Sequence, residues 1–247
     1  MKKIGIIIQA RMDSLRLPGK VLMKLGNMSL LEFLIKRLKW LNNNFGLIVA
    51  TTTNKKDKKI VKLCQSLNVN YFCGSEENVL KRYVDCAQKF SIDIIIRICA
   101  DCPFVSLQGI DQLTRIYFKN PNADLIHNKD KNGYPFGTGV ELVKLEALKQ
   151  AEKKVATQYQ KEHVLPYILE NPDKFKIIKV NTPEDIRRTN YYLTVDYPED
   201  LKLARKILAK IKNSDKTKIP LRKIIKLLDK NPNIAKINSL LHEGYIG

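Results

Sequence analysis

Short apolar runs recur along the chain and predict the strands of a mostly parallel sheet. The two strongest runs are Ile4–Ile8 and Ile92–Ile98, the second interrupted only by Asp93 and Arg97. Runs without polar alternation are typical of central strands that are buried on both faces. Further strands are predicted at Leu47–Ala50, Val69–Phe72, Ala123–His127, Val140–Val143, Phe175–Val180 and Tyr191–Val195.

Between these runs, apolar residues recur at helical spacing. Ser29 can cap the first helix, whose leucines from Leu30 to Leu41 share one face. Other helices are predicted over residues 55–67, 77–90, 107–118, 144–153, 160–170 and 197–212, and two short helices separated at Pro232 over 220–242. Strands that alternate with helices imply parallel pairing, so we predict a Rossmann-like, doubly wound α/β fold.

The size and composition suit one sizeable α/β domain. The 247 residues are 44% hydrophobic, which is enough for one core. We expect residues 1–247 to be a single domain, with residues 128–190 as an extension for acceptor binding or dimerisation. No run reaches the ~20 apolar residues of a membrane span, and the run at Ile4–Ile8 is too short for a signal peptide. We therefore expect a cytoplasmic protein without membrane insertion.

The net charge of +19 admits three kinds of partner: nucleic acid, an acidic membrane surface or a polyanionic small molecule. The lysines are spread over the whole chain, without a basic tail or a basic stripe with interleaved aromatic residues. This distribution disfavours nucleic acid as the main partner.

The five cysteines do not predict a disulfide framework, because their number is odd and the chain is not small. Cys99 and Cys102 form a Cys-x-x-Cys pair, but no second pair or nearby histidine completes a zinc site. We expect buried structural thiols, and the role of Cys99 and Cys102 stays open.

The segment after the first strand concentrates positive charge where a ligand is expected. In open α/β sheets, ligands bind beyond the carboxyl ends of the strands. Arg11, Arg16 and Lys20 all lie in this segment, together with Pro18-Gly19. Three cations can hold a nucleoside triphosphate through charge-assisted hydrogen bonds. The segment has neither the Walker spacing nor the dinucleotide fingerprint, and by its residues alone it equally fits a solvated polar loop.

Two carboxylates also follow predicted strands. Asp101 comes after the strand that ends at Ile98, and Asp196 comes directly after Val195. If both strands belong to one sheet, the two side chains meet, and one or two carboxylates with substrate phosphates are a usual Mg²⁺ site. The alternatives are a turn residue for Asp101, and for Asp196 a cap on the helix that begins at Pro198.

Several sequence blocks resemble one enzyme family. Ile8-Gln9-Ala10-Arg11-Met12, followed by Arg16-Leu17-Pro18-Gly19-Lys20-Val21-Leu22, resembles the opening of the SpsF-type cytidylyltransferases of spore-coat polysaccharide biosynthesis, which are similar to the CMP-Kdo and CMP-sialic acid synthetases. Arg-Ile-x-x-Asp-Cys-Pro around Asp101 and Leu-Thr-Val-Asp-x-Pro-Glu-Asp-Leu around Asp196 also look like family blocks, and the resemblance covers nearly the whole chain. The chain departs from the family at Asp13 and Leu15, where Gly and Thr are usual, and at Ala100, where Gly is frequent.

The resemblance implies a cytidylyltransferase that moves CMP from CTP to a sugar, polyol or sugar-acid acceptor and releases pyrophosphate, for surface polysaccharide biosynthesis. It implies that Asp101 and Asp196 bind Mg²⁺, that Arg11, Lys20 and Asp101 are catalytic, and that Glu141 touches the acceptor. The residues it places around the nucleotide are Gln9, Ala10, Arg11, Arg16, Lys20, Ser75, Arg82 and Ala100. Ser75 equally fits a helix cap, and Arg82 equally fits a helix surface. The resemblance also implies a homodimer.

Two other functions stay open at this point. A metal-dependent glycosyltransferase of similar fold would consume a nucleotide sugar and release no pyrophosphate, but its usual Asp-x-Asp is missing after the middle strand. A nucleic-acid-binding protein is suggested by charge alone, and salt-sensitive binding to arbitrary DNA would support it. The sequence leaves open the acceptor and the preference for CTP over other nucleotides.

Overall fold

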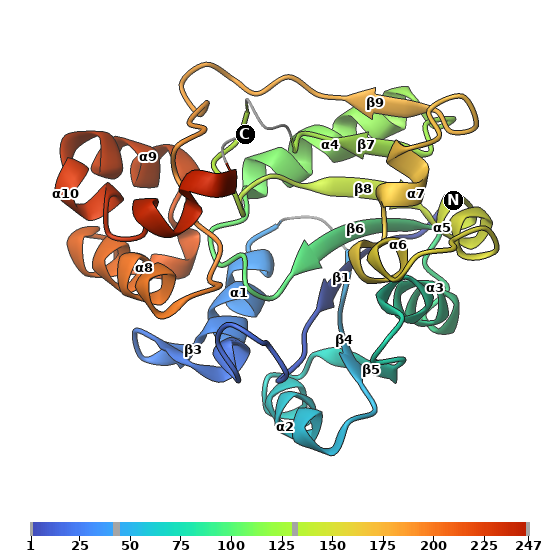
Figure 1. The fold of residues 1–247 in the computed structure, drawn as a ribbon, viewed down its shortest axis with the longest axis horizontal. Helices are drawn as coiled ribbons and strands as arrows, with labels where there is room; N and C mark the ends of the chain where they lie inside the picture. Colours follow the sequence, from blue (N-terminus) through green and yellow to red (C-terminus); the bar gives the residue numbers. More distant parts are fainter. Residues whose placement is uncertain (1, 42–44, 130–132, 246–247) are drawn as a thin grey trace.

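The computed structural model describes residues 2–41, 45–129 and 133–245, and a twisted central sheet dominates this part of the chain (Figure 1). Within these residues the sheet has seven strands in the order β5-β4-β1-β6-β8-β7-β9. Their bounds are β1 (Ile4–Gln9), β4 (Gly46–Thr52), β5 (Asn70–Gly74), β6 (Ile94–Cys99), β7 (Leu125–His127), β8 (Glu141–Lys144) and β9 (Ile177–Lys179). Among these seven described strands, β8 alone runs antiparallel to its neighbours, β6 and β7. The prediction of a mostly parallel α/β sheet is confirmed.

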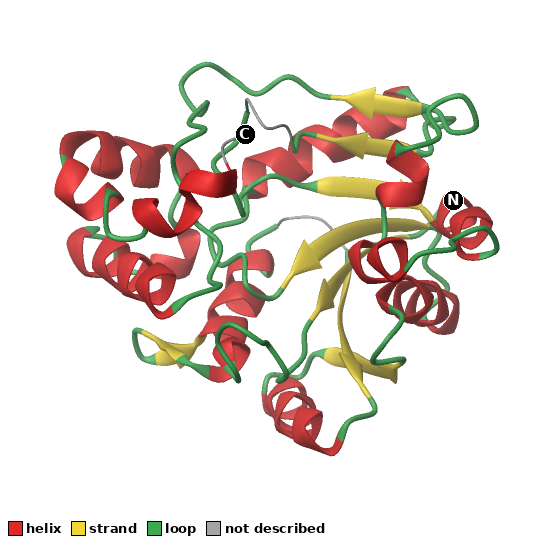
Figure 2. Ribbon diagram, in the orientation of Figure 1, coloured by secondary structure: helices red, strands yellow, loops and turns green. Residues whose placement is uncertain are grey.

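Helices cover both faces of the sheet, as Figure 2 shows. The alternation within β1 explains why: Ile6 and Ile8 face one cluster of buried side chains, and Ile7 faces another. The first cluster takes side chains from α1 (Leu30–Leu38), α2 (Lys58–Ser66) and α4 (Leu107–Lys119), and the second from α3 (Val79–Lys89), α5 (Leu145–Glu152) and α7 (Pro166–Leu169). A strand covered on both sides needs no polar face, which is the origin of its continuous apolar run.

A third cluster of buried side chains lies under the C-terminal helices, which gather on one side of the sheet in Figure 1. It joins α8 (Pro198–Lys210), α9 (Leu221–Lys230) and α10 (Pro232–Ala235) to the hairpin of β2 (Lys24–Leu25) and β3 (Met28–Ser29). The buried side chain of Arg37 fastens this lobe to α1, because its Nη1 donates to the carbonyl oxygens of Thr217 and Ile219 at 2.9 and 2.8 Å. Burial lowers the pKa of Arg37 to about 10.

Most predicted helices are present with ends shifted by a few residues. Ser29 caps α1 in a capping box with Glu32, as expected. The remaining described elements are short 3₁₀ turns: η1 (Lys20–Leu22), η2 (Lys55–Asp57), η3 (Lys216–Lys218) and η4 (Ser239–Tyr245). None of the helices in the described part of the chain combines the length and apolar character needed to cross a bilayer.

Two predictions of local structure are wrong. The helix predicted over 160–170 is two helices, α6 (Gln158–His163) and α7, broken at Val164, whose φ of 72° is strained for a β-branched residue. Leu165 N–H donates to the His163 carbonyl at 2.9 Å, which makes a γ-turn. Pro166 favours this break, because it has no N–H to donate to the Glu162 carbonyl and its ring would clash with that carbonyl in a continuous helix.

The strand predicted at Tyr191–Val195 is also absent as a sheet strand. In the described residues this segment makes only an isolated parallel bridge, between Tyr192 and Phe136. Its apolar residues are buried under the C-terminal helices instead of in the sheet. An apolar run records burial, and burial under helices leaves the same pattern as burial in a sheet.

Candidate active site

The chain reverses its direction of travel across the sheet at β1. From β1 it moves outward to β4 and β5, and β6 pairs with the other edge of β1. In open α/β sheets a reversal of this kind leaves a crevice at the carboxyl ends of the two strands. The loop after β1 and the loop after β6 both begin at this crevice, and they carry Arg11 and Asp101.

A buried aspartate holds the loop after β1 in place. Asp57, 2% exposed, accepts a hydrogen bond from Met12 N–H at 2.7 Å. Its other oxygen accepts from the hydroxyls of Thr51 and Thr52 at 3.0 and 2.6 Å. Sequence analysis missed this residue, because Asp57 stands in a lysine-rich helical segment and its partners come from other elements.

The loop after β1 brings two cations onto two carboxylates. Lys20 Nζ lies 2.7 Å from Asp101 Oδ2 and 2.7 Å from Asp196 Oδ1. Arg16 Nη2 lies 2.8 Å from the same oxygen of Asp196. We call Arg16, Lys20, Asp101 and Asp196 the cation–carboxylate cluster. The side chain of Lys20 is 9% exposed and those of Asp101 and Asp196 are 26% and 13% exposed, so the cluster is at the floor of the crevice yet open to a ligand.

Asp101 and Asp196 meet as expected, but by a different route. They were predicted to follow two strands of one sheet, whereas Asp196 follows the segment that is not a sheet strand. Val195 N–H donates to the Asp101 carbonyl at 2.8 Å, and this bond ties that segment to the loop after β6. The alternative role of Asp196 as a helix cap is wrong, since Tyr197 occupies the N-cap position of α8.

Opposite charges dominate the titration of the two cations. Burial alone would lower the pKa of Lys20, but the carboxylates of Asp101 and Asp196 outweigh it and raise that pKa. The pKa of Arg16 is raised in the same way, with Asp196 outweighing the cost of burial. Both side chains are therefore fully charged at neutral pH, as binding of a polyphosphate requires.

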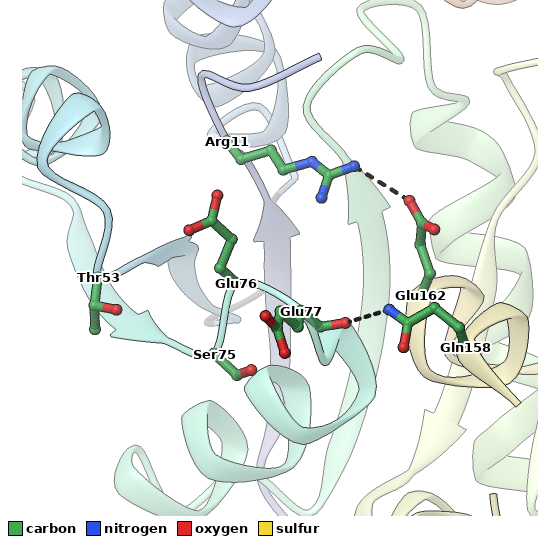
Figure 3. A pocket seen from close by; sticks show the side chains of 7 residues that line it. All are labelled: Arg11, Thr53, Ser75, Glu76, Glu77, Gln158 and Glu162. Carbon is green, nitrogen blue, oxygen red and sulfur yellow. Dashed lines mark hydrogen bonds and ion pairs between the residues drawn. The ribbon is translucent and has the colours of Figure 1, made fainter. Parts of the chain in front are cut away.

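A pocket of about 640 Å³ opens at the ends of β4 and β5, and Arg11, from the loop that also carries Arg16 and Lys20, is one of its lining residues. Figure 3 shows Arg11 reaching across it to Glu162 on α6, with 3.2 Å between Arg11 Nη2 and Glu162 Oε1. Below them Gln158 Nε2 donates to the carbonyl of Glu77 at 2.9 Å. The residues that line the pocket are Arg11, Thr53, Ser75, Glu76, Glu77, Gln158 and Glu162.

Ser75 and Arg82, both predicted near the nucleotide, belong to one loop structure. Ser75 lines the pocket, and its hydroxyl accepts from Asn78 N–H at 3.0 Å. The N-cap of α3 is Asn78, so the cap alternative for Ser75 is wrong. Arg82 is buried, and its Nη1 donates to the Ser75 carbonyl at 2.6 Å. It is therefore not a helix-surface residue, and it supports the pocket from behind.

A second polar network lies at the ends of β1, β6 and β8. Arg97 donates to Gln9 Oε1 at 3.1 Å and to Glu141 Oε2 at 2.7 Å, and Lys129 Nζ lies 3.0 Å from the same Glu141 oxygen. Burial would raise the pKa of Glu141, but Lys129 and Arg97 outweigh burial and lower it to about 2. Acceptor binding by Glu141 stays a prediction, and the partners Arg97 and Lys129 were missed by sequence analysis.

Ala10 and Ala100 are buried and contribute backbone at the ends of the two central strands. Ala10 N–H donates to the Ala50 carbonyl at 3.1 Å, and Ala100 N–H donates to the Gln9 carbonyl at 3.0 Å. The expectation of buried thiols holds for Cys64 and Cys86, whereas Cys73 is exposed and Cys99 and Cys102 are only partly buried.

Comparisons with known proteins agree with this geometry. The family model described as cytidylyltransferase matches residues 5–231. The chain is 43% identical to an uncharacterised protein of Methanocaldococcus jannaschii, over 97% of this chain and 95% of that protein. It is 32% identical to the spore coat polysaccharide biosynthesis protein SpsF of Bacillus subtilis, over 95% of this chain and 98% of that protein.

Solved structures show the same similarity. A cytidylyltransferase from Leptospira borgpetersenii superposes with a TM-score of 0.89 at 30% identity, covering 96% of this chain and 98% of that one. CMP:2-keto-3-deoxy-manno-octonic acid synthetase, solved in complex with CTP, shares the fold with a TM-score of 0.66 at 16% identity, over 85% and 99% of the two chains. The fold and site define an α/β nucleotidyltransferase. The chain belongs to the cytidylyltransferase family.

Proposed function

We propose that this protein transfers CMP from CTP to a sugar-like acceptor and releases pyrophosphate. The cation–carboxylate cluster is the observation that carries the proposal. Lys20 and Arg16 supply positive charge to a triphosphate, and Asp101 and Asp196 stand within the same few ångströms. Charged donors and acceptors at one crevice are what positioning and charge stabilisation of phosphoryl chemistry require.

The two carboxylates fit a magnesium ion. Both are bonded to one ammonium nitrogen at 2.7 Å, so a cation already stands between them in the protein alone. No group of three or more acidic, histidine or cysteine side chains that could hold a metal occurs among the described residues. A site of two carboxylates completed by substrate phosphates and water is usual for Mg²⁺. When bound, the ion would neutralise phosphate charge and stabilise the leaving pyrophosphate.

The residues of this chain have separate tasks in the proposed reaction. Lys20 and Arg16 bind the triphosphate and orient its α-phosphorus, and Arg11 turns from Glu162 to a phosphate oxygen. The acceptor oxygen, either a phosphate oxygen or a hydroxyl that loses its proton to water, attacks the α-phosphorus, the bond from that phosphorus to the bridging oxygen breaks, and pyrophosphate leaves with the electron pair. No covalent intermediate on the protein is needed.

The pocket lined by Arg11 and Ser75 suits the nucleoside. It begins at Arg11 and extends to Ser75, with Glu76 and Glu77 on its wall. The amino group of cytosine is a donor, and carboxylate, hydroxyl and carbonyl oxygens in the pocket are acceptors for it. These oxygens support CTP, and a uridine base, which presents a carbonyl at that position, would meet them unfavourably.

The acceptor and the setting are proposed from the relatives. SpsF of Bacillus subtilis is named for spore coat polysaccharide biosynthesis, so we propose a sugar, polyol or sugar-acid acceptor destined for a surface polysaccharide. We also propose a cytoplasmic homodimer, which light scattering of the purified protein tests.

A pyrophosphate-release assay tests the function. Each of the four nucleoside triphosphates is offered with Mg²⁺ against phosphorylated sugars, phosphorylated polyols and 2-keto sugar acids. Release that requires both CTP and one acceptor supports the proposal, and Asp101→Asn or Asp196→Asn should then reduce turnover at least about 100-fold. Glu146→Gln, which alters an exposed ion pair on α5, is the matched control and should retain full activity.

Two results would contradict the proposal. Undiminished turnover in both aspartate variants would remove the metal assignment. Consumption of a nucleotide sugar without any pyrophosphate would instead support a glycosyltransferase.

A further inference from the structure

The C-terminal segment, residues 238–242, returns from the helical lobe to the residues around Asp196. In Figure 1 the end of the chain folds back from α10 toward the middle of the molecule. Asn238 and His242 are both 2% exposed, although the neighbouring Leu240 is 79% exposed. Two polar side chains are thus buried near the end of the chain, whereas an apolar one faces solvent. Buried polar side chains need hydrogen-bond partners.

Asp200, on the first turn of α8, is the hydrogen-bond partner of both polar side chains. This carboxylate is 2% exposed and accepts hydrogen bonds at both oxygens. Oδ1 accepts from Asn238 Nδ2 at 2.6 Å and from His242 Nε2 at 2.9 Å. A buried carboxylate needs several donors to replace its hydration, and the C-terminal segment supplies two of them.

The other oxygen of Asp200 acts on the site. Oδ2 accepts from the backbone N–H groups of Asp196 and Tyr197, both at 2.8 Å. These two bonds fix the peptide planes on either side of the Asp196 α-carbon. The direction in which the Asp196 carboxylate points therefore depends on Asp200 staying in place.

The aromatic rings next to Asp196 are held by the same segment. His242 stacks on Tyr192 with ring centroids 3.9 Å apart and an interplanar angle of 3°, and it meets Tyr197 edge-on at 6.0 Å. Asn238 Nδ2 also donates to the Tyr192 carbonyl at 3.0 Å. Tyr197 in turn lies under the Arg16 guanidinium, 5.2 Å from ring centroid to Cζ. The segment contacts the chain before and after Asp196.

We propose that Asn238 and His242 are positioning residues of the active site, which hold Asp200 so that Asp200 aims Asp196 at the metal and triphosphate. The metal part of this inference rests on the proposed function. The mechanical part, that the C-terminal segment orders the backbone at Asp196, does not. Residues 238–242 thereby support the site through their contacts with Asp200, Tyr192 and Tyr197.

Hydrogen exchange on the free protein tests the mechanical part without substrate. His242→Ala should raise the exchange rate of the Asp196 and Tyr197 amides at least about fivefold, because Asp200 loses one of its donors. Asn238→Ala removes the other donor, and serves in its place if His242→Ala does not fold. Tyr191→Phe is the matched control: it deletes the 2.8 Å bond from Tyr191 to Asp229 in the same stretch of chain and should leave these two amides unchanged.

Metal binding tests the positioning part. With CTP present, Mn²⁺ titration followed by electron paramagnetic resonance should show a half-saturation concentration about three- to tenfold higher in His242→Ala than in the wild type. His242→Gln, which retains an N–H donor, should recover most of the difference, and the control Tyr191→Phe should bind as the wild type does. In the pyrophosphate assay kcat should fall most in His242→Ala, less in His242→Gln and not in Tyr191→Phe. The KM for the acceptor should stay constant.

The outcomes are distinguishable. Wild-type exchange at Asp196 and Tyr197 in folded His242→Ala and Asn238→Ala would overturn the inference. So would wild-type Mn²⁺ affinity in both variants. A wild-type protein inactive with CTP, whose variants still show faster exchange, would refute the proposed function and support the mechanical coupling.

Discussion

Replacing Lys20 by methionine tests two roles of this residue: it neutralises the charges of Asp101 and Asp196, and it binds the nucleotide. The variant keeps the length of the side chain and removes its charge. In the native protein Nζ lies 2.7 Å from an oxygen of each aspartate. The two oxygens are therefore at most about 5.4 Å apart, and two unit charges at ~5.4 Å repel by about 3 kcal/mol at an effective dielectric constant of about 20.

Arg16 still neutralises part of Asp196 in the variant, and water reaches Asp101, so the net loss should be about 2–3 kcal/mol of unfolding free energy without metal. For a chain of this length that loss lowers the melting temperature by about 4–12 °C. Magnesium should restore more stability to Lys20→Met than to the wild type, because the ion no longer competes with an ammonium for the two carboxylates. Nucleotide affinity should fall, since a phosphate loses its cation.

Thermal unfolding with and without millimolar Mg²⁺ measures the loss of stability and its recovery by the ion. Calorimetric titration with CTP measures the loss of nucleotide affinity. Lys36→Met is the control, because it removes an exposed ion pair between successive turns of α1, which contributes at most about 0.5 kcal/mol. If Lys20→Met melted at the wild-type temperature and responded to Mg²⁺ as the wild type does, the electrostatic argument for the cluster would be wrong. Unchanged affinity for CTP would reduce the loop after β1 to a scaffold.

Three further predictions concern neighbouring contacts. Asp57→Ala should lower the unfolding free energy by about 2–3 kcal/mol in urea titration and weaken CTP binding, because the loop that carries Arg11 loses its buried anchor. Glu162→Gln should tighten CTP binding by up to about fivefold in calorimetry. In the wild type Arg11 must break its exposed ion pair with Glu162 to reach the nucleotide, which costs at most about 1 kcal/mol, and the variant has no such pair to break. The contribution of Glu141 to stability should depend on pH, because its pKa in the folded protein is about 2 against 4.5 for the free side chain. A depressed pKa stabilises the folded state above pH ~4.5 and stops doing so as the pH falls toward ~2, so the stability deficit of Glu141→Gln, at most about 3 kcal/mol, should shrink over that window.

Each of these predictions has a contrary result. A variant of Asp57 with wild-type stability would show that water replaces the hydrogen bonds of its carboxylate. Weaker CTP binding in Glu162→Gln would mean that Glu162 itself contacts the nucleotide. A deficit of Glu141→Gln that stayed constant from pH 5 to pH 2.5 would contradict the ion-paired carboxylate.

The strands and helices were largely predictable because their patterns are local. The apolar run Ile4–Ile8 alone predicts a strand that is buried on both faces. Ser29 and the residues of the next turn predict the start of a helix. The antiparallel direction of β8 was not predictable, since a short buried run has no polarity of its own. The prediction of a strand at Tyr191–Val195 was wrong because these residues are buried under helices. Hydrophobicity alone does not show whether a segment is buried in a sheet or under helices.

The sequence by itself determined which charged groups follow the buried strands: a loop with Arg11, Arg16 and Lys20 after the first strand, and two aspartates after apolar segments. Only the tertiary structure decided how those groups are held together. Asp57 anchors the loop, and Asp200 receives donors from residues 38 and 42 positions further along the chain. The physical reason is that a charge is visible in a sequence, whereas the partner that satisfies it is selected by packing between elements that are distant along the chain.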